Sequence, residues 1–458
     1  MRLFDLFRPF RLTPAPVSAL PARAKTMRFR PYQLIGTHFL RTVKRGVLCD
    51  APGLGKTFQA TEATELPAII SCPVNLCDQW AEFIAAEYPQ DRVSVAAYGT
   101  PRERQSAIDA EWDWLIVNHD MWRKYFMPSI NTLILDEMHH FRGRNAKRSE
   151  MLALRAQMTP RVYGLTATPI YKDVSDLYHL LHVLDPSAWK SYWQFVDRYA
   201  ITADYGYGTK IVRTKPHTDL RSQLIKYMLG RTYKDVGMYL PPRIDKQVVL
   251  RLTKPQQDAY IRIKQDYKLK LDDGTYKRFF NASEVEHTLR RFTMTPEKIA
   301  TIHRIIDDTP MYSDGNGDAR TDRKPEPVIV FTKYRESASR IAEALGGALI
   351  TGDMDPRERR TTALYAKQRV RVATIDSITE GVDLSDYRTV IFAEEDYVPG
   401  KQYQALSRVL RHRPDGRQGP VIVYYIRYQR TVDMAVHRAV QTRITDAGDV
   451  VREALADT

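Results

Sequence analysis

Short runs of apolar residues recur along the first third of the chain, and each is followed by a segment in which apolar residues return at helical spacing. The runs lie at residues 47–49, 67–72, 114–117, 132–135 and 161–165. Runs of this length, rich in Val, Ile and Leu, are typical of strands, and strands that alternate with helices form a parallel sheet covered on both faces. Residues 27–173 are therefore predicted to form one α/β lobe.

The same alternation returns in the last third of the chain. Its apolar runs lie at residues 328–331, 348–350, 370–373, 389–392 and 421–425. They predict a second parallel sheet within residues 328–445. The expected fold class is therefore α/β, with two parallel-sheet lobes in tandem.

The chain between the two lobes has a different pattern. Residues 174–308 are rich in aromatic and basic residues, and leucines recur at helical spacing between positions 177 and 184, which predicts helical protrusions. A Leu-Pro-Pro sequence at 240–242 breaks any helix and leads into a β-prone run at 247–250, which we expect to cross between the lobes. Residues 309–327 have no core-forming content and are predicted to be a disordered loop.

Both ends of the chain are predicted to be tails. Residues 1–26 alternate Phe and Leu with Arg and contain four prolines, so they lack the unbroken apolar core of a signal peptide. We expect a flexible tail there. The Leu and Phe residues between positions 3 and 10 leave open a second interpretation, a short segment that docks on a partner. Residues 446–458 are expected to form the C-terminal tail.

Charge and cysteine content narrow the class of protein. Of 458 residues, 69 are Lys or Arg and 55 are Asp or Glu, which gives a net charge of +14. Such an excess favours a partner rich in phosphate. No apolar run reaches the ~18 residues that a membrane-spanning helix requires, so no membrane association is expected. Cys49, Cys72 and Cys77 show no zinc-ligand spacing and are interpreted as reduced core thiols of a cytoplasmic protein.

The sequence Asp50-Ala-Pro-Gly-Leu-Gly-Lys-Thr57 stands between an apolar run and a helical pattern. Gly53 and Gly55 allow backbone N–H groups to surround phosphate oxygens, and Lys56 supplies a positive charge at the β- and γ-phosphates. The Thr57 hydroxyl can ligate Mg²⁺. Asp50 occupies a position where the general phosphate-loop pattern has Gly. The segment predicts an ATP site.

An acidic pair, Asp136 and Glu137, follows the predicted strand at residues 132–135. Carboxylate oxygens are preferred ligands of Mg²⁺, so the pair and the phosphate loop together predict an NTPase that uses ATP and Mg²⁺. His139 and His140 come next in the chain. Adjacent side chains at one strand end point apart, so a metal site made by these two histidines is not favoured.

Five further segments occur in a fixed order around these two motifs, at residues 30–33, 73–80, 164–169, 379–384 and 404–411. Together the seven segments make the chain from residue 28 to about residue 440 resemble superfamily 2 helicases, most closely their Swi/Snf-like ATPase branch. The resemblance implies two tandem RecA-like lobes with helical insertions between them, and it points to duplex DNA as the nucleic acid.

The resemblance assigns nucleotide chemistry to residues in both lobes. Gln33 resembles the glutamine that reads adenine, Asp136 the outer Mg²⁺ anchor, and Glu137 the general base that orients the attacking water. Arg408 and Arg411 resemble arginines that reach the γ-phosphate from the opposite lobe, a contact worth ~10³ to 10⁵ in rate. The remaining nucleotide-binding candidates are Arg30, Tyr32, Pro52, Gly53, Leu54, Gly55, Lys56, Thr57, Gly381, Asp383 and Gln404.

A second set of residues resembles the family's coupling and nucleic-acid motifs. Thr166 and Thr168 resemble the motif that relays the nucleotide state to the nucleic acid, and His140 is assigned as the coupling histidine after the acidic pair. Gly381 and Asp383 also resemble an interlobe strand-binding motif. The candidate contacts to the nucleic-acid backbone are Trp80, Lys333 and Thr374. The alternatives for these three are a core aromatic residue, a solvated lysine and an ordinary strand residue.

The leading functional hypothesis is an ATP-dependent DNA translocase or helicase that moves along, or remodels, duplex or branched DNA. An RNA-dependent helicase and a nucleotide-gated DNA clamp without processive movement remain as alternatives. The chain departs from the Swi/Snf-like pattern at Met138, where Ala is usual, and at Ser407, where Asp is expected. Residues 379–384 resemble strand-separating helicases equally well. A nucleotide kinase shares the phosphate loop but has no use for the arginines of the second lobe.

Overall fold

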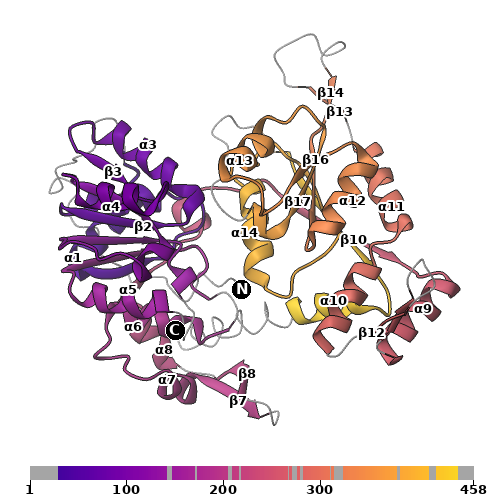
Figure 1. Ribbon diagram of the computed structural model, residues 1–458, viewed down its shortest axis with the longest axis horizontal. Coiled ribbons are helices and arrows are strands. Elements are labelled where there is room, and N and C mark those ends of the chain that lie inside the picture. Colours follow the sequence, from indigo (N-terminus) through magenta and orange to yellow (C-terminus); the bar gives the residue numbers. More distant parts are fainter. Residues whose placement is uncertain are drawn as a thin grey trace. The chain divides into compact units, whose positions relative to one another are not determined.

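The computed structural model describes residues 29–141, 147–170, 173–204, 209–215, 218–266, 268–270, 276–278, 282–309, 311–313, 323–378, 382–411 and 419–441. These residues form two compact units that divide the described chain between Tyr239 and Leu240 (Figure 1). The predicted tails at 1–26 and 446–458 lie outside the described residues. Within the described part of the chain, no helix has both the length and the apolar character needed to cross a membrane.

The first unit is built on a parallel sheet of seven strands in the order β3-β4-β2-β5-β6-β1-β9. The strands are β1 (Arg45–Leu48), β2 (Ala68–Cys72), β3 (Val93–Val95), β4 (Trp114–Asn118), β5 (Thr132–Asp136), β6 (Arg161–Leu165) and β9 (Met228–Leu229). All five apolar runs predicted for this lobe contribute strands, and β3 and β9 extend the sheet at its two edges.

Consecutive side chains of these strands enter two different apolar cores. In β5, Leu133 and Leu135 pack into the core on one face of the sheet and Ile134 packs into the core on the other. Helices therefore cover both faces, which explains why the sequence shows unbroken apolar runs instead of alternation. The helices are α1 (Pro31–Val43), α2 (Lys56–Ala63), α3 (Cys77–Glu87), α4 (Pro101–Asp109), α5 (Lys147–Gln157), α6 (Asp176–Leu184), α7 (Tyr192–Tyr199) and α8 (Thr218–Leu224).

The second unit contains a parallel sheet of six strands in the order β10-β19-β18-β15-β17-β16. These strands are β10 (Arg243–Leu250), β15 (Val328–Thr332), β16 (Ala348–Ile350), β17 (Val370–Thr374), β18 (Thr389–Phe392) and β19 (Val421–Tyr428). The helices are α9 (Lys254–Asp266), α10 (Ala282–Phe292), α11 (Pro296–Asp307), α12 (Arg335–Leu345), α13 (Pro356–Tyr365) and α14 (Pro399–Val409). Two tandem parallel-sheet lobes with helical insertions confirm the predicted fold class.

The region between the two predicted lobes contains strands as well as helices. An antiparallel pair is formed by β7 (Ala200–Asp204) and β8 (Thr209–Thr214), and a second by β11 (Lys268–Lys270) and β12 (Tyr276–Arg278). The predicted extended run at 247–250 is the second half of β10. Most of β10 is exposed. Its first half is mostly polar and charged, so the sequence shows no apolar run there that would predict a strand.

The segment predicted as a disordered loop, residues 309–327, contains two paired strands. β13 (Met311–Ser313) and β14 (Arg323–Pro325) form an antiparallel ladder. Residues 314–322, which join them, lie outside the described residues. Three-residue strands in a sequence of Asp, Gly and Pro give no periodic signal, so only the backbone pairing reveals them.

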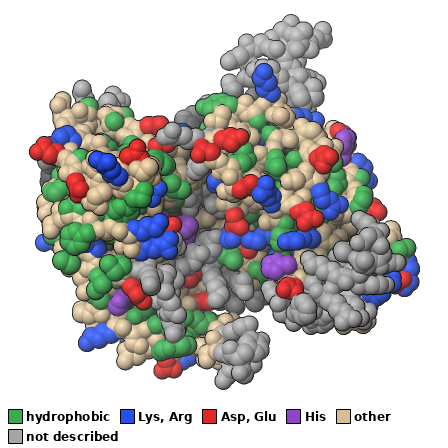
Figure 2. Space-filling model, in the orientation of Figure 1, with side chains coloured by type: hydrophobic (Ala, Val, Ile, Leu, Met, Phe, Trp, Pro, Cys, Tyr) green, Lys and Arg blue, Asp and Glu red, His purple; other side chains and the backbone are tan. Residues whose placement is uncertain are grey.

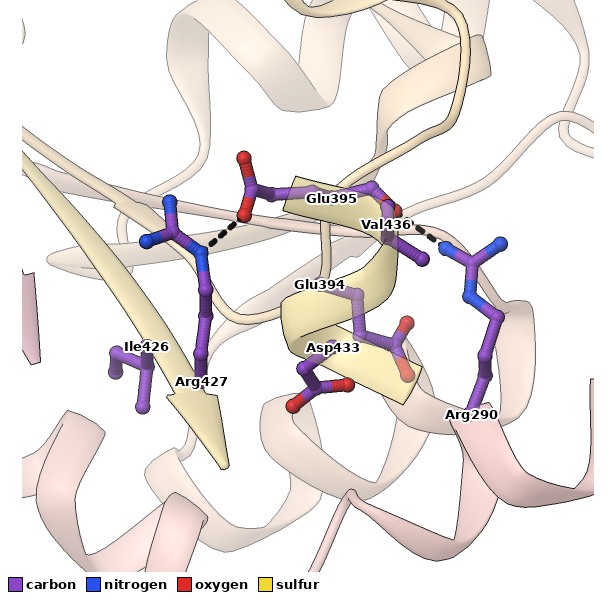
Figure 3. A pocket seen from close by; sticks show the side chains of 7 residues that line it. All are labelled: Arg290, Glu394, Glu395, Ile426, Arg427, Asp433 and Val436. Atoms are coloured by element: carbon purple, nitrogen blue, oxygen red, sulfur yellow. Dashed lines mark hydrogen bonds and ion pairs between the residues drawn. The ribbon is translucent and has the colours of Figure 1, made fainter. Parts of the chain in front are cut away.

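Buried ion pairs hold the end of β19 in the second unit to its surroundings. Arg427 is 4% exposed, and its guanidinium donates to the carboxylate of Glu395 and to the side-chain carbonyl of Gln247. Arg290 of α10 donates to the backbone carbonyl of Glu395. Figure 3 shows Arg427, Glu395 and Arg290 around a small pocket that Glu394 and Asp433 also line. The guanidinium groups of Arg427 and Arg290 therefore both find hydrogen-bond acceptors, as burial of a charge in a protein interior requires.

Lys298 of α11 is fully buried in the same unit, with an exposed fraction of 0%. Its ammonium lies 2.9 Å from the Asp433 carboxylate and 3.0 Å from the backbone carbonyl of Ala393. Replacing Lys298 by Met leaves Asp433 without its cation, and removing one partner of a buried pair destabilises by about 3 to 5 kcal/mol. We expect a correspondingly lower midpoint in urea unfolding followed by circular dichroism.

The control for this prediction is Lys254→Met. Lys254 of α9 pairs with Asp258 at 3.0 Å, but its side chain is 81% exposed. Exposed pairs contribute only about 0 to 1 kcal/mol, so the control variant should unfold close to the unmodified protein. Equal midpoints for the two variants would contradict a structural role for the Lys298 pair.

Candidate active site

The predicted phosphate loop joins the end of β1 to the first turn of α2. Gly53 and Gly55 have φ angles of 77° and 75°, in the left-handed region that favours glycine. A Cβ atom on Gly55 would lie 2.3 Å from the side-chain nitrogen of Gln33, whereas one on Gly53 would meet no atom within 4 Å. The backbone angle therefore explains why residue 53 is glycine. At residue 55, both the angle and the close approach of Gln33 require glycine. The loop leads into a helix N-terminus, which is the arrangement that binds phosphate.

Lys56 begins α2, and its ammonium points back towards the loop. Nζ donates to the backbone carbonyl of Asp50 at 2.7 Å and to that of Ala51 at 3.4 Å. Burial lowers the pKa of Lys56, while the carboxylates of Glu137, Asp50 and Asp136 oppose that shift. The cation is thus held among carbonyls and carboxylates at the position where a nucleotide phosphate would bind.

Gln33 of α1 lies against the loop, as its predicted role requires. Its side-chain oxygen accepts from the backbone N–H of Arg30 at 2.9 Å, and its side-chain nitrogen is 3.5 Å from the carbonyl of Leu54. The first contact belongs to a capping box that begins α1. Helix capping therefore fixes the side chain beside the phosphate loop. Its contact with adenine remains a prediction.

Asp136 is the last residue of β5. One carboxylate oxygen accepts from the indole N–H of Trp80 at 2.8 Å, and the other accepts from the backbone N–H of Glu137 at 3.0 Å. Burial and the neighbouring Glu137 carboxylate raise the pKa of Asp136 to about 7. Trp80 itself is 3% exposed. The structure therefore places Trp80 as a core residue that orients Asp136, which differs from the predicted contact with the nucleic-acid backbone.

Glu137 adopts a left-handed backbone conformation, with φ of 46°. Such a conformation is unfavourable for a residue with a side chain and is found disproportionately at functional sites. Its carboxylate lies 3.2 Å from Nδ1 of His139, and the same ring nitrogen lies 3.1 Å from the Thr166 hydroxyl. The Thr166 hydroxyl in turn accepts from the backbone N–H of Thr168 at 3.1 Å. A continuous polar chain therefore joins Glu137 to the end of β6.

His139, and not His140, occupies the linking position in this chain. The family resemblance assigned His140, whose ring is tilted against those of His139 and His119 with centroid distances of 4.6 and 5.6 Å. The reason is local: residues 138–141 form a 3-10 helix after β5, which turns His139 inwards to 3% exposure. The strand end that the sequence analysis assumed at the two histidines is not present, because β5 ends at Asp136.

In the second unit, Arg408 lies in the last turn of α14 and Arg411 two residues after that helix. The backbone carbonyl of Arg408 accepts from the N–H of Leu384 at 3.0 Å, and the guanidinium of Arg411 lies 3.0 Å from the Asp383 carboxylate. The segments at 382–384 and 408–411, which belong to two separate predicted motifs, are thus neighbours in this unit. Gln404 is buried within α14 at 5% exposure. Gly381 lies outside the described residues.

The other candidates of the second unit lie at the carboxyl ends of strands. Thr374 ends β17 and is buried. Lys333 follows β15, and its ammonium lies 2.5 Å from Asp396 and 3.1 Å from Asp376. Burial alone would lower the pKa of Lys333, but these carboxylates raise it to about 12. Lys333 is therefore a charged lysine in an ion-pair cluster, and its contact with a nucleic-acid backbone stays a prediction.

Among the described residues, neither the distribution of charge on the face drawn in Figure 2 nor a cluster of metal-ligating side chains indicates another site. On the face drawn in Figure 2, Lys and Arg side chains are interspersed with Asp and Glu over both units. Among the described residues, no group of three or more His, Cys, Asp and Glu side chains is arranged to hold a metal ion. A Mg²⁺ ion at Thr57 and Asp136 would need phosphate oxygens and water as its other ligands, which is how this ion is usually bound.

Comparison with known families now adds to this geometry. A family model for the SNF2-related domain matches residues 32–302, more than half of the chain. The chain belongs to the SNF2-related family. A second model, the helicase conserved C-terminal domain, matches residues 298–413. The membership confirms the resemblance identified from the sequence and the predicted enzyme class, a nucleic-acid-dependent ATPase.

Individual SNF2-related proteins are similar over most of this chain. The SWI/SNF-related matrix-associated actin-dependent regulator of chromatin subfamily A-like protein 1 homolog of Caenorhabditis elegans is 25% identical, over 97% of this chain and 65% of that protein. MOT1, a TATA-binding protein-associated factor of Saccharomyces cerevisiae, is 22% identical over 93% of this chain and 27% of that protein. The chain therefore spans less than two thirds of either relative. Among solved structures, the Sulfolobus solfataricus SWI2/SNF2 ATPase core in complex with dsDNA has 18% identity and a TM-score of 0.43, over 95% of this chain and 97% of that one.

Replacing His139 by Ala tests the polar chain of this SNF2-related ATPase. The change removes both the 3.2 Å contact of the His139 ring with the Glu137 carboxylate and the hydrogen bond between that ring and the Thr166 hydroxyl. A single hydrogen bond contributes up to about 1.5 kcal/mol. We expect roughly tenfold lower stimulation of ATP hydrolysis by DNA, with the KM for ATP in the absence of DNA unchanged. Phosphate release with and without DNA measures both quantities.

His140→Ala is the matched control, because it changes the adjacent histidine and removes the residue chosen from the sequence. We expect its DNA stimulation to stay within about twofold of the unmodified protein, because the contacts that join Glu137 to Thr166 run through the His139 ring. A larger loss in His140→Ala than in His139→Ala would restore the original assignment of the coupling histidine.

Proposed function

We propose that this chain is an ATP-driven translocase that moves along duplex or branched DNA. The observation that carries the proposal is the polar chain from Glu137 through His139 and Thr166 to Thr168. A general base needs no such connection to hydrolyse ATP. The connection does allow the state of the nucleotide site to change the end of β6, a segment that resembles the family's coupling motif.

The residues of the first unit have complementary tasks in this mechanism. The phosphate loop binds the nucleotide through backbone N–H groups, and Lys56 supplies charge. Thr57 and Asp136 would hold Mg²⁺, which neutralises phosphate charge. Glu137 accepts the proton of the attacking water, and it does so within a strained turn that fixes the carboxylate.

The second unit is proposed to complete the reaction. Arg408 and Arg411 would contact the γ-phosphate when the two lobes approach each other, and an arginine supplied in this way stabilises the transition state by a large factor. Hydrolysis then depends on a movement of one lobe relative to the other. Repeated cycles of that movement would transfer the grip on DNA from one lobe to the other.

Two measurements test the proposal. ATP turnover should rise in the presence of duplex DNA, and displacement of the third strand from a DNA triplex should require both ATP and an intact Glu137. Binding should also weaken with salt, with a slope of about −0.9 per neutralised phosphate on duplex DNA. ATP turnover that no nucleic acid changes would contradict the proposal.

The alternatives give different results in the same experiments. A nucleotide-gated clamp would hydrolyse ATP on DNA without displacing the triplex strand. An RNA helicase would be stimulated by RNA more strongly than by DNA, because contacts to the backbone and the 2′-hydroxyl group distinguish the two polymers. Comparing single-stranded, duplex and forked DNA with RNA therefore separates the three functions.

A further inference from the structure

Arg231 is a buried arginine beneath the phosphate loop that none of the catalytic assignments uses. It follows β9, in the segment that leads to Tyr239 at the end of the first unit, and is 7% exposed. Its guanidinium lies 2.9 and 2.5 Å from the two oxygens of the Asp50 carboxylate. It also donates to the side-chain oxygen of Gln59 at 2.6 Å and to the backbone carbonyl of Tyr32. One side chain therefore joins three elements around the loop.

Asp50 explains why an arginine is needed at this place. It begins the phosphate loop, where the general pattern has Gly, and its exposed fraction is 0%. A buried carboxylate is strongly unfavourable unless it is paired and hydrogen-bonded. Arg231 pairs with it through both carboxylate oxygens, the strongest geometry for an ion pair. The pair also compensates a negative charge that would otherwise oppose the binding of phosphate nearby.

Gln59 of α2, which accepts from Arg231, also contacts both ends of the phosphate loop. Its side-chain nitrogen donates to Asp50 at 3.0 Å and lies 3.3 Å from the carbonyls of both Leu54 and Gly55. Leu54 and Gly55 are the last two residues of the loop before α2 begins at Lys56. Arg231, Asp50 and Gln59 thus fix both the beginning and the end of the phosphate loop.

Gly36, in the middle of α1, provides independent support for this arrangement. A Cβ atom at that position would lie 1.7 Å from the Gln59 side-chain oxygen and 2.8 Å from the Arg231 guanidinium. Glycine within a helix costs about 1 kcal/mol relative to Ala. The helix therefore carries an unfavourable residue at a position where any side chain would collide with Gln59 and Arg231.

The backbone of the same segment runs along the loop. The N–H groups of Cys49 and Ala51 donate to the carbonyls of Leu229 and Arg231 at 2.7 and 2.9 Å, which continues the pairing of β1 with β9 into the loop. The Tyr233 hydroxyl donates to the carbonyl of Pro52. The segment therefore holds the loop through its backbone and two side chains.

We propose that Arg231 is a positioning residue for nucleotide binding, which acts through Asp50 and Gln59 to hold the phosphate loop in its binding conformation. The inference depends on ATP binding by the SNF2-related core and not on movement along DNA. The segment that follows β9 and ends the first unit at Tyr239 therefore helps to hold the nucleotide site in place. A change in that segment would be transmitted to the loop.

Arg231→Met tests the proposal in the full chain without DNA. We expect the Kd for a fluorescent ATP analogue and the KM for ATP to rise at least tenfold, with a much smaller change in kcat. Arg231→Lys should recover part of the affinity, because an ammonium can pair with Asp50 but cannot bridge to Gln59 and Tyr32 at the same time. An unchanged Kd in folded Arg231→Met would overturn the proposal.

Arg45→Met is the control for a general loss of stability. Arg45 lies at the opposite end of β1 and donates to the backbone carbonyls of Ala156, Thr159, Val183 and Leu184. Its removal should lower the melting temperature and leave the Kd for the ATP analogue unchanged. If Arg45→Met weakened nucleotide binding as much as Arg231→Met, the effect of Arg231 would be structural only and the proposal would fail.

Gly36→Ala gives a second test that removes no charge, in case Arg231→Met does not fold. The added methyl group displaces Gln59 and Arg231 from each other, so the proposal again predicts a Kd raised several-fold. Wild-type affinity in Gly36→Ala would overturn it. Loss of DNA stimulation with normal nucleotide affinity would instead concern the proposed translocase function, so the two failures are distinguishable.

Discussion

Replacing Glu137 by Gln should reduce kcat for ATP by about 10³, within the range of 10² to 10⁴ for a general base, while the Kd for ATP stays close to the unmodified value. The amide has nearly the same shape as the carboxylate and can still lie beside His139 and Asp136, but it cannot accept the proton of the attacking water. The phosphate loop and Lys56, which bind the nucleotide, are unchanged. Steady-state phosphate release and binding of a fluorescent ATP analogue measure the two quantities separately.

Glu82→Gln on α3 is a suitable control, because Glu82 is an exposed glutamate of the same unit. It should leave both kcat and Kd unchanged. Normal turnover in Glu137→Gln would reject Glu137 as the base. A large rise in Kd would show instead that the residue holds the nucleotide site together.

Arg408→Ala should lower kcat by about 10³, as expected for an arginine that stabilises the transferring phosphoryl group. The Kd for ATP should change little, because the phosphate loop lies in the first unit and Arg408 in the second. Such a split between kcat and Kd is the signature of a contact made mainly in the transition state. Single-turnover hydrolysis in the presence of DNA gives the rate without interference from product release.

Arg340→Ala provides the comparison, since Arg340 is an exposed arginine on α12 of the same unit. Removing it lowers the net charge equally and should leave kcat unchanged. Arg411→Ala should show a loss similar to that of Arg408→Ala if both arginines reach the phosphate. If Arg408→Ala and Arg340→Ala hydrolysed ATP equally fast, the assignment of Arg408 to the reaction would be wrong.

The strands of both sheets were predictable because their sequences are dictated by burial. The runs at 132–135 and 328–331 are apolar at every position but one, as strands covered on both faces must be. β10 was only half recognised, since most of its residues are exposed and polar. β7, β8 and β13 are short antiparallel strands in which pairing, and not composition, determines the structure.

The candidate nucleotide site could be proposed from the sequence wherever backbone geometry or phosphate chemistry restricts the residue type. Left-handed φ angles require Gly53 and Gly55, and phosphate and Mg²⁺ require Lys56, Thr57 and Asp136, so these residues appear as a motif in the sequence. His140 was assigned from the family resemblance alone, whereas the 3-10 helix after Glu137 turns His139 inwards, which no pattern in the sequence indicated. Trp80 could not be placed from its type, since an indole is suitable both for a core and for stacking on a base.

By itself the sequence determined the family and the two α/β lobes, and it predicted an ATP-cleaving centre in the first lobe and arginines of the second that would complete it. Periodic burial and the geometry of phosphate binding both restrict residues that are close together in the chain, and such restrictions can be read directly. Only the tertiary structure decided that Arg231 supports the phosphate loop and that His139 joins Glu137 to Thr166. Both contacts connect residues that are distant in sequence or depend on one local turn, and no pattern of neighbouring residues records them.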